Sequence, residues 1–333
     1  MGCEKVKDDT SGWIEITEGV PEGGLISVYF TSESVGYAVG EEGVIIKTED
    51  GGFTWESQSS GTTSFLRGIH FVNSTTGFAV GLGGTILKTT NGGQTWTNSS
   101  LPGFPGYNFT SVFFTDVNNG YAVGSVYTGG DWHGFIVNTS NGGASWSELM
   151  LSTSTAHSLT SVFFTSASVG YAVGNAHNYP VYSSVVMKTV NGGISWSPMS
   201  LLIAPSLYDI FFTSPTTGYA VGTDGDEHWY GGIIKTTDSG ATWTRIDLPY
   251  TSYGYTLWSV HFPDANTGYA VGTGGTIFKT KDGGNTWIDL SKNLLKIDDS
   301  YGLRDFAGVF FTNAVNGIVV GYNYGKILKT EGQ

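Results

Sequence analysis

Three short segments of this 333-residue chain concentrate side chains that binding and catalytic sites use. They read SVYTGGDWHG from Ser125, NAHNYPVYSS from Asn175 and TDGDEHWYGG from Thr223. Aromatic residues with polar edges are favoured at protein interfaces and in sugar-binding clefts, so these segments are candidate recognition sites. The candidate binding residues are Tyr127, Asp131, Trp132, His133, His177, Tyr179, Tyr182, Asp224, Asp226, Glu227, His228, Trp229 and Tyr230, together with Arg67, Tyr253 and Trp258.

The same segments allow catalytic or metal chemistry. A glycosidase needs a carboxylic acid and a carboxylate about 5–9.5 Å apart. The carboxyl groups available are those of Asp131, Asp224, Asp226 and Glu227. The run from Asp224 to Glu227 could hold Ca²⁺ through oxygen ligands, although its ligand pattern is incomplete. Three histidines could converge on zinc without any local spacing that requires it. They are His133, His177 and His228. We expect no enzyme, metal or cofactor, with a glycoside hydrolase of the Asp-box type as an alternative.

An internal repeat must position these residues. The segment TEDGGFTW at Thr48–Trp55 recurs in five variants, and a further copy begins at Thr330. Successive copies begin 41 to 50 residues apart, which is typical of propeller blades, each a small antiparallel sheet. Each copy follows a GYAVG-like segment, and these segments begin at Gly36, Gly77, Gly120, Gly170, Gly218, Gly268 and Gly317. Seven copies predict an all-β, seven-bladed β-propeller of four-stranded antiparallel blades.

Each repeated box has its own local chemistry. Its Asp or Asn can accept hydrogen bonds from backbone amides two residues on, forming an Asx-type turn. The Gly pair that follows supplies positive φ without steric cost, and the Trp is expected to cover the outer edge of the blade. These residues are Asp50, Trp55, Asn91, Trp96, Asn141, Trp146, Asn191, Trp196, Asp238, Trp243, Asp282 and Trp287. Because the copies are equivalent, we interpret them as a scaffold rather than as one active site.

The last repeat is divided between the two ends of the chain. The box that begins at Thr330 stops at Gln333, and its missing half resembles the segment that ends at Trp13. We therefore expect Trp13–Thr17 to supply the outer strand of the last blade and to close the ring by hydrogen bonds. The expected organisation is one propeller domain over residues 12–333, preceded by a linker over residues 1–11.

Insertions distinguish one face of the expected propeller from the other. Because strands alternate in direction, the connections between the second and third strands of all blades emerge on one face. They are short at Leu82–Gly84 and Thr273–Gly275, in blades two and six, and expanded in the neighbouring blades three, four and five. We expect the expansions to form a wall beside the central opening, either as a recognition surface or as a lid of self-packed aromatic residues. His70 and His261 stand where other blades carry Tyr or Phe, and we expect them to pack between blades.

Charge and hydropathy exclude several partners. The chain has 28 acidic and 15 basic residues, for a net charge of −13, which disfavours nucleic acid and anionic lipid surfaces. No apolar run approaches the roughly 20 residues of a membrane span. The single cysteine, Cys3, precedes a polar stretch to Ser11, an arrangement that resembles the mature start of a bacterial lipoprotein. We expect an exported monomer, periplasmic or at the cell surface, that meets a membrane only through a lipid anchor at Cys3.

The order of apolar run, GYAVG, GTIxKT and D/N-G-G-x-T-W resembles the plant and cyanobacterial photosystem II stability/assembly factors, and more broadly the bacterial BNR or Asp-box repeat proteins. The resemblance covers about Gly12 to Gln333. It implies a seven-bladed propeller and a basic patch of arginines at the start of the inner strands. Those positions hold Ile26, Arg67, Thr110, Thr160, Tyr208, Trp258 and Ala307, so only Arg67 matches. We therefore expect a binding or scaffold propeller for a protein or glycan partner, with photosystem II assembly as an alternative.

Overall fold

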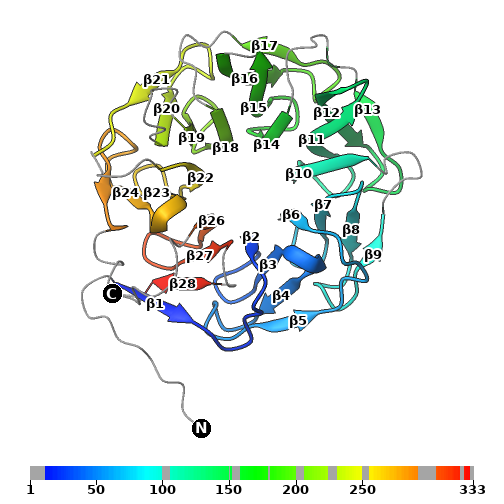
Figure 1. Cartoon of the computed structure of the whole chain (residues 1–333), viewed down its shortest axis with the longest axis vertical. Helices are drawn as coiled ribbons and strands as arrows, with labels where there is room; N and C mark the ends of the chain where they lie inside the picture. Colours follow the sequence, from blue (N-terminus) through cyan, green and yellow to red (C-terminus); the bar gives the residue numbers. More distant parts are fainter. Residues whose placement is uncertain are drawn as a thin grey trace.

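A computed structural model describes residues 12–99, 106–149, 151, 158–178, 181–199, 206–223, 231–249, 255–291, 305–322 and 326–330. In these residues seven four-stranded sheets are arranged radially around a central axis (Figure 1), and every strand pairing within them is antiparallel. The predicted seven-bladed all-β propeller is confirmed. No helix in the described ranges has the length and hydropathy of a membrane span.

Each blade runs from an inner strand at the axis to an outer strand at the rim. Blade one comprises β2 (Leu25–Phe30), β3 (Gly36–Gly40), the short 3₁₀ helix η1 (Glu41–Gly43), β4 (Ile45–Thr48) and β5 (Glu56–Gln58), and blade two β6 (Leu66–Phe71), β7 (Gly77–Gly81), β8 (Ile86–Thr89) and β9 (Thr97–Asn98). Blade three comprises β10 (Tyr107–Phe114), β11 (Gly120–Thr128), β12 (Asp131–Thr139) and β13 (Ser147–Leu149), and blade four β14 (Ser158–Phe164), β15 (Gly170–Asn178), β16 (Val181–Thr189) and β17 (Ser197–Met199).

The remaining three blades follow the same order. Blade five comprises β18 (Ser206–Phe212), β19 (Gly218–Thr223), β20 (Gly231–Thr236) and β21 (Thr244–Ile246), and blade six β22 (Leu257–His261), β23 (Gly268–Gly272), η2 (Thr273–Gly275), β24 (Ile277–Thr280) and β25 (Ile288–Asp289). Blade seven comprises β26 (Phe306–Phe311), β27 (Gly317–Gly321), β28 (Ile327–Thr330) and, from the other end of the chain, β1 (Trp13–Ile16).

The ring closes as the divided repeat predicts. β1 is the outer strand of blade seven and pairs with β28 from Trp13 opposite Thr330 to Ile16 opposite Ile327. Figure 1 shows β1 and β28 side by side at the rim. Lys326 Nζ also lies 2.6 Å from Glu15 Oε1, so an ion pair reinforces the same junction. Two strands from opposite ends of the chain thus complete one sheet, and blade seven depends on both.

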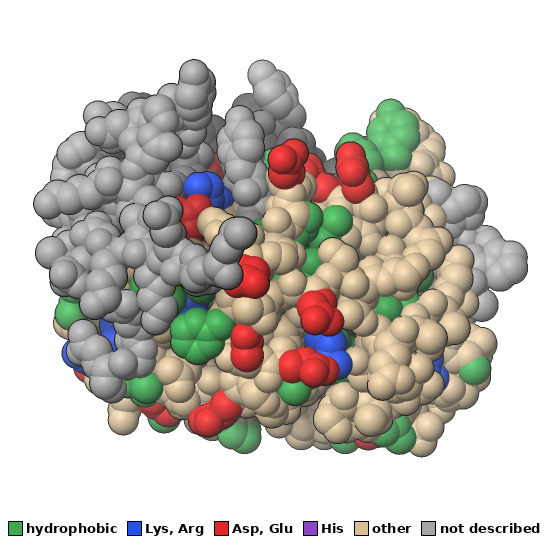
Figure 2. All heavy atoms as spheres, turned by 90° about the horizontal axis from the view of Figure 1, so that it is seen from below, with side chains coloured by type: hydrophobic (Ala, Val, Ile, Leu, Met, Phe, Trp, Pro, Cys, Tyr) green, Lys and Arg blue, Asp and Glu red, His purple; other side chains and the backbone are tan. Residues whose placement is uncertain are grey.

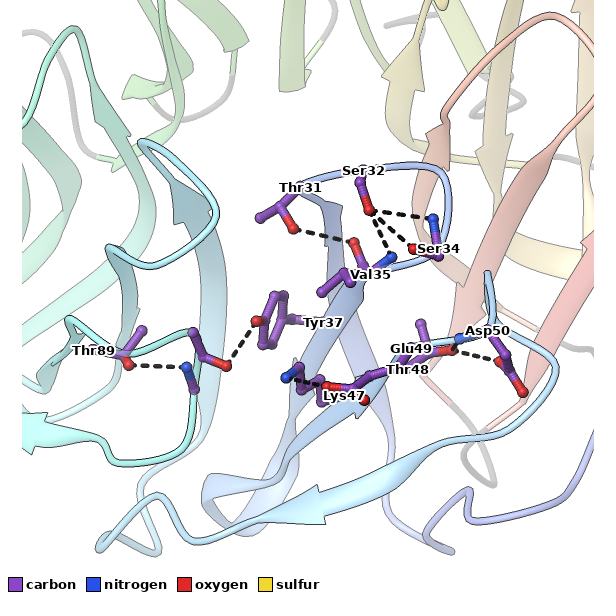
Figure 3. Close-up of polar contacts among 12 residues, drawn as sticks. Thr31, Ser32, Ser34, Val35, Tyr37, Lys47, Thr48, Glu49, Asp50 and Thr89 are labelled. Atoms are coloured by element: carbon purple, nitrogen blue, oxygen red, sulfur yellow. Dashed lines mark hydrogen bonds and ion pairs between the residues drawn. The ribbon is translucent and has the colours of Figure 1, made fainter.

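The Asp boxes are held by hydrogen bonds that differ from the expected pattern. Asp50 Oδ1 accepts hydrogen bonds from the backbone N–H groups of Phe53 (2.9 Å) and Thr54 (3.0 Å), three and four residues on rather than two. Thr48 Oγ1 donates to Asp50 Oδ1 (2.8 Å) and accepts from the N–H of Gly52 (2.8 Å), as Figure 3 shows in part. The expected Asx-type turn is therefore wrong in its spacing, because the threonine hydroxyl occupies the nearer amides. Bonds from Thr242 and Thr286 lower the pKa of Asp238 and Asp282, respectively, to about 2.

Neighbouring blades are joined by a repeated aromatic contact. The Tyr37 ring of β3 stacks on Phe71 of blade two with centroids 4.1 Å apart, and its hydroxyl donates to the carbonyl oxygen of Gly92 (2.8 Å; Figure 3). Phe71 in turn meets the edge of Trp96 at 6.0 Å. The box tryptophans are therefore packed against the inner strands of the blades, and all of them except the half-buried Trp243 are buried, rather than covering an outer edge.

Candidate functional site

A β-bulge in every inner strand creates the candidate site. In each blade the register of the inner strand shifts by one residue at the bulge, for example between Leu257 and Ser259. The bulged side chain then turns toward the axis instead of into the blade. The bulged residues are Ile26, Arg67, Thr110, Thr160, Tyr208, Trp258 and Ala307, and all of them line one axial cavity of about 620 Å³. Arg67 and Trp258, proposed from the sequence, are thereby brought to the same cavity.

In blades one to six the last glycine of the GYAVG-like segment makes the bulge possible, whereas a Cβ added at Gly321 of blade seven would lie 3.1 Å from the carbonyl oxygen of Asp305. In blade six this residue is Gly272, which pairs with Leu257 at the bulge. A Cβ added there would overlap the carbonyl oxygen of Thr256 and lie 2.8 Å from its carbonyl carbon and 3.0 Å from the Cα of Leu257. Backbone, not a flexible side chain, fills this space. The glycine of β23 therefore holds the neighbouring strand close and, with it, directs Trp258 into the cavity.

We expect Gly272→Ala to lower the free energy of unfolding by about 3 kcal/mol or more, because the clash forces two backbones apart. Urea denaturation measures the loss. Gly106→Ala is the matched control, because a Cβ on Gly106 meets no atom within 4 Å and we expect it to change stability by less than about 0.5 kcal/mol. Equal stability of the two variants would contradict the role assigned to the close approach.

Two aromatic pairs lie on different sides of the cavity. On the side of blades seven, one and two, the rings of Phe65 and Tyr322 lie 6.2 Å apart, and the Arg67 guanidinium carbon lies 5.2 Å from the Phe65 ring. On the side of blades five and six, Tyr208 and Trp258 have ring centroids 4.3 Å apart at an angle of 46°. Burial lowers the pKa of Arg67 from its ordinary value, but an arginine remains charged at neutral pH. The cavity therefore combines aromatic walls with a cation on one side.

Asp209 is a cavity residue that the sequence reasoning missed. Its Oδ1 accepts hydrogen bonds from Ser161 Oγ (2.8 Å) and from the N–H of Ile210 (2.9 Å). Its Oδ2 accepts hydrogen bonds from Ser259 Oγ (3.1 Å) and from the N–H of Val260 (3.0 Å). The carboxyl group thus joins blades four, five and six. Burial raises its pKa, and the four hydrogen bonds oppose that shift. A signal existed, because the equivalent position holds only Ser or Gly in the other six blades: Ser27, Gly68, Ser111, Ser161, Ser259 and Gly308.

A belt of seven aromatic side chains surrounds the channel deeper along the inner strands. Its members are Tyr29, His70, Phe113, Phe163, Phe211, His261 and Phe310, and neighbouring ring centroids lie 4.4–5.3 Å apart all the way round. The expected packing of His70 and His261 between blades is confirmed. Burial lowers the pKa of His70 to about 4 and that of His261 to about 3, so both imidazoles are neutral at pH 7. His261 Nδ1 accepts a hydrogen bond from the Phe311 N–H (3.2 Å).

The insertions of blades three and four are extended β-hairpins rather than loops. β11 and β12 continue to a tip where Tyr127 pairs with Trp132, and these rings meet edge to face with centroids 5.4 Å apart. Tyr127 is 59% exposed and Trp132 43% exposed, so this pair packs on itself and still presents aromatic surface. In blade four the register places His177 opposite Tyr182. The insertions of blades three and four therefore lengthen the middle strands of their blades, which extend beyond the face on which these connections emerge.

The other candidates divide by position. Asp131 lies at the tip of the β11–β12 hairpin, and His133 is half-buried in β12. Tyr179, Asp224, Asp226, Glu227, His228, Trp229, Tyr230, Tyr253 and Cys3 lie outside the described residues. Within the described ranges no group of three or more His, Cys, Asp or Glu side chains could hold a metal ion. The calcium run and two members of the histidine set, His177 and His228, have no described side chains, so the metal alternatives fall outside the described part.

Acidic side chains outnumber basic ones on the visible surface, as the composition of the chain predicts. Figure 2 views the molecule from the side of β1 and β5 and shows acidic side chains along this flank and at its upper margin, with few basic ones between them. Arg67 is the only Lys or Arg among the described residues that line the cavity, whereas two acidic residues, Asp209 and Asp305, line it as well. The basic patch implied by the resemblance is thus reduced to one guanidinium in the described cavity.

The fold and cavity define a seven-bladed β-propeller of the Asp-box type with an axial cavity. The sequence pattern of one family, described as photosynthesis system II assembly factor YCF48, matches residues 58–155, 187–296 and 234–331. The chain belongs to this family. No curated protein matches the chain.

Three solved structures illustrate how widely the fold is shared. YCF48 bound to D1 peptide is 19% identical, with a TM-score of 0.72 over 99% of this chain and 100% of that one. YCF48 from Cyanidioschyzon merolae is 22% identical, with a TM-score of 0.69 over 96% and 98%. The GH74 xyloglucanase from Xanthomonas campestris is 14% identical, with a TM-score of 0.69 over 96% of this chain and 54% of that one. At these identities the likeness establishes the fold alone.

Proposed function

We propose that this protein is a non-enzymatic binding propeller that receives a segment of a protein partner in its axial cavity. The observation that carries the proposal is the ring of bulged side chains, which places Arg67, Tyr208 and Trp258 around one cavity although they come from blades two, five and six. Arg and large aromatic residues are the side chains that contribute most to protein interfaces. A similar propeller of the same family is described as bound to D1 peptide, which supports a peptide as the ligand.

The hairpin tip of blade three offers a second contact for such a partner. Tyr127 and Trp132 rise from the same face as the cavity and keep aromatic surface exposed. A segment seated in the cavity would leave the rest of the partner above this face, within reach of the hairpins. We assign the cavity the larger share of the affinity, because aromatic and Arg side chains at the shielded centre of an interface contribute most of the binding energy.

The repeat itself supplies variants that test the cavity. Thr stands at the bulged position in blades three and four, so Arg67→Thr with Trp258→Thr keeps a side chain that the fold already accepts there. Peptides selected from a displayed random library on the wild-type protein should bind the double variant at least about 30-fold more weakly, the effect of losing about 2 kcal/mol at a hot spot. Isothermal titration calorimetry measures the dissociation constants, and the thermal midpoint should stay within a few degrees.

Tyr127→Ala with Trp132→Ala is the matched control, because both residues lie outside the cavity lining and we expect a loss of less than about tenfold. Unchanged peptide affinity in the cavity variant would contradict the proposal. So would release of sugar from a glycan, which would instead support the hydrolase alternative. Binding of glycans without hydrolysis, and of no peptide, would assign the cavity to carbohydrate.

A further inference from the structure

The wall of blades five and six has features that the proposed peptide-binding function does not by itself explain. Tyr208 and Trp258 occupy the same bulged position in adjacent blades, and their ring planes meet at 46° with centroids 4.3 Å apart. Trp258 remains 37% exposed, so the aromatic corner is open on the cavity side. In the other blades this position holds either smaller side chains or Arg67. The corner is therefore a local feature of the cavity and is not imposed by the repeat.

A carboxyl group lies beside this corner. Asp209 directly follows Tyr208 and lines the same cavity, and its hydrogen bonds to Ser259 and Val260 hold it against the strand that carries Trp258. Of the described lining residues only Arg67 is basic, and it stands in blade two, three blades away round the ring. The four N–H and O–H donors to its two oxygens favour the ionised form of Asp209 against the effect of burial. A negative charge in a cavity with low-dielectric walls acts more strongly than one in open water.

We propose that Tyr208, Trp258 and Asp209 form a subsite for an alkylammonium group, the side chain of a lysine in the bound segment. An ammonium ion is attracted to the faces of Trp and Tyr rings and to a nearby carboxylate, and both features meet here. The hydrogen bonds that hold Asp209 need not break, because the attraction acts through the field of the carboxylate and through the aromatic faces. An anionic group would be repelled from this wall and attracted to Arg67 instead.

The inference deepens the proposed function and names the chemistry of one ligand position. Arg67 lies in blade two, whereas the acidic lining residues Asp209 and Asp305 lie in blades five and seven, so the only basic side chain among the described lining residues is separated from Asp209 across the cavity. A segment with a lysine directed toward blades five and six and a carboxylate toward blade two would match both. Such polarity would select the orientation of the bound segment as well as its composition.

Small probes test the subsite without a known partner. In an ¹⁵N NMR titration, Nα-acetyl-lysine amide should shift the indole N–H signal of Trp258, which is identified by its loss in Trp258→Phe. Nα-acetyl-norleucine amide has a neutral side chain of similar length and should bind about tenfold more weakly, the effect expected of a cation–π contact with a nearby carboxylate. The indole signal of Trp132, at the hairpin tip, serves as an internal control and should not move.

Asp209→Asn and Asp209→Ser separate the charge from the fold. Serine stands at this position in four other blades, so the serine variant is compatible with the strand, and both variants should fold with native near-ultraviolet circular dichroism. In both, the preference for lysine over norleucine should fall to about twofold or less. Equal binding of the two probes to the wild type would overturn the inference, as would a preference that survives in Asp209→Asn.

The outcome is distinguishable from failure of the proposed function. If library peptides bind in the cavity and neither probe is preferred, only the lysine subsite is wrong. If the lysine probe shifts Trp258 but no peptide binds, the subsite stands and the protein partner is wrong. A probe that carries a sugar and binds Trp258 better than lysine amide would assign the aromatic corner to carbohydrate stacking and overturn the inference.

Discussion

Deleting residues 1–16 will prevent the propeller from forming a stable closed ring. The deletion removes β1, whose Trp13, Ile14 and Ile16 side chains are all buried, and leaves β28 as an unpaired outer edge in blade seven. Burial of three such side chains contributes about 5–9 kcal/mol, which is comparable to the whole stability of an ordinary domain. We expect the truncated protein to be insoluble, or to unfold at least 15 °C below the full chain by circular dichroism.

Two further chains make this result specific to ring closure. Deletion of residues 1–11 leaves β1 in place and should keep the wild-type thermal midpoint. A rearranged chain with residues 12–20 joined after Gln333, in place of the natural start, supplies the same strand from the other end and should recover most of the lost stability. If the 1–16 deletion kept the wild-type midpoint, closure through β1 would not be what holds the ring together.

Replacing both channel histidines by phenylalanine will flatten the pH dependence of stability. The pKa of His70 is about 4 and that of His261 about 3 in the folded protein, against about 6.5 when unfolded. Both folded values are depressed, so the unfolded chain binds the protons first, and folding stability falls as pH drops below 6.5. From pH 7 to pH 5 this costs about 2 kcal/mol for each histidine, and about 4 kcal/mol for the pair.

The double variant His70→Phe with His261→Phe isolates this effect. Phenylalanine already stands at the same position of the aromatic belt in four blades, at Phe113, Phe163, Phe211 and Phe310. The carboxyl groups that titrate in the same range are common to both proteins, so their contributions cancel in the comparison. Urea denaturation at pH 7, 6 and 5 should show wild-type stability falling by about 4 kcal/mol more than that of the variant. Parallel curves would show that the imidazoles are not desolvated in the belt.

Most of the fold could be predicted because the information is local and repeated. Seven copies of one box and one GYAVG segment establish the number of blades, and the divided copy predicts the pairing that β1 and β28 make. The distance along the chain between the box Asp and the amides that it binds was predicted incorrectly. Thr48 occupies the nearer amides, so Asp50 binds the amides three and four residues on, and only the three-dimensional turn shows which acceptor each amide meets.

The candidate site could be predicted only in part. The family resemblance singled out the seven positions at the start of the inner strands, including Arg67 and Trp258, but the sequence did not predict that each is a bulged residue. Asp209 was missed because a single acidic residue in a strand is unremarkable until its neighbours Ser161 and Ser259 are known to face it. The hairpin character of the blade three insertion was also missed, since it depends on the cross-strand pairing of Tyr127 with Trp132.

The sequence by itself therefore determined the architecture: the blade number, the closure and the residues that build each turn, because each of these depends on short-range chemistry repeated along the chain. Only the tertiary structure decided which unrepeated residues meet. Arg67, Asp209 and Trp258 are far apart in the chain and share one cavity because the inner strands of all blades converge on a single axis and carry a bulge at the same level. Convergence of this kind is a property of the closed ring, and no segment of the chain contains it.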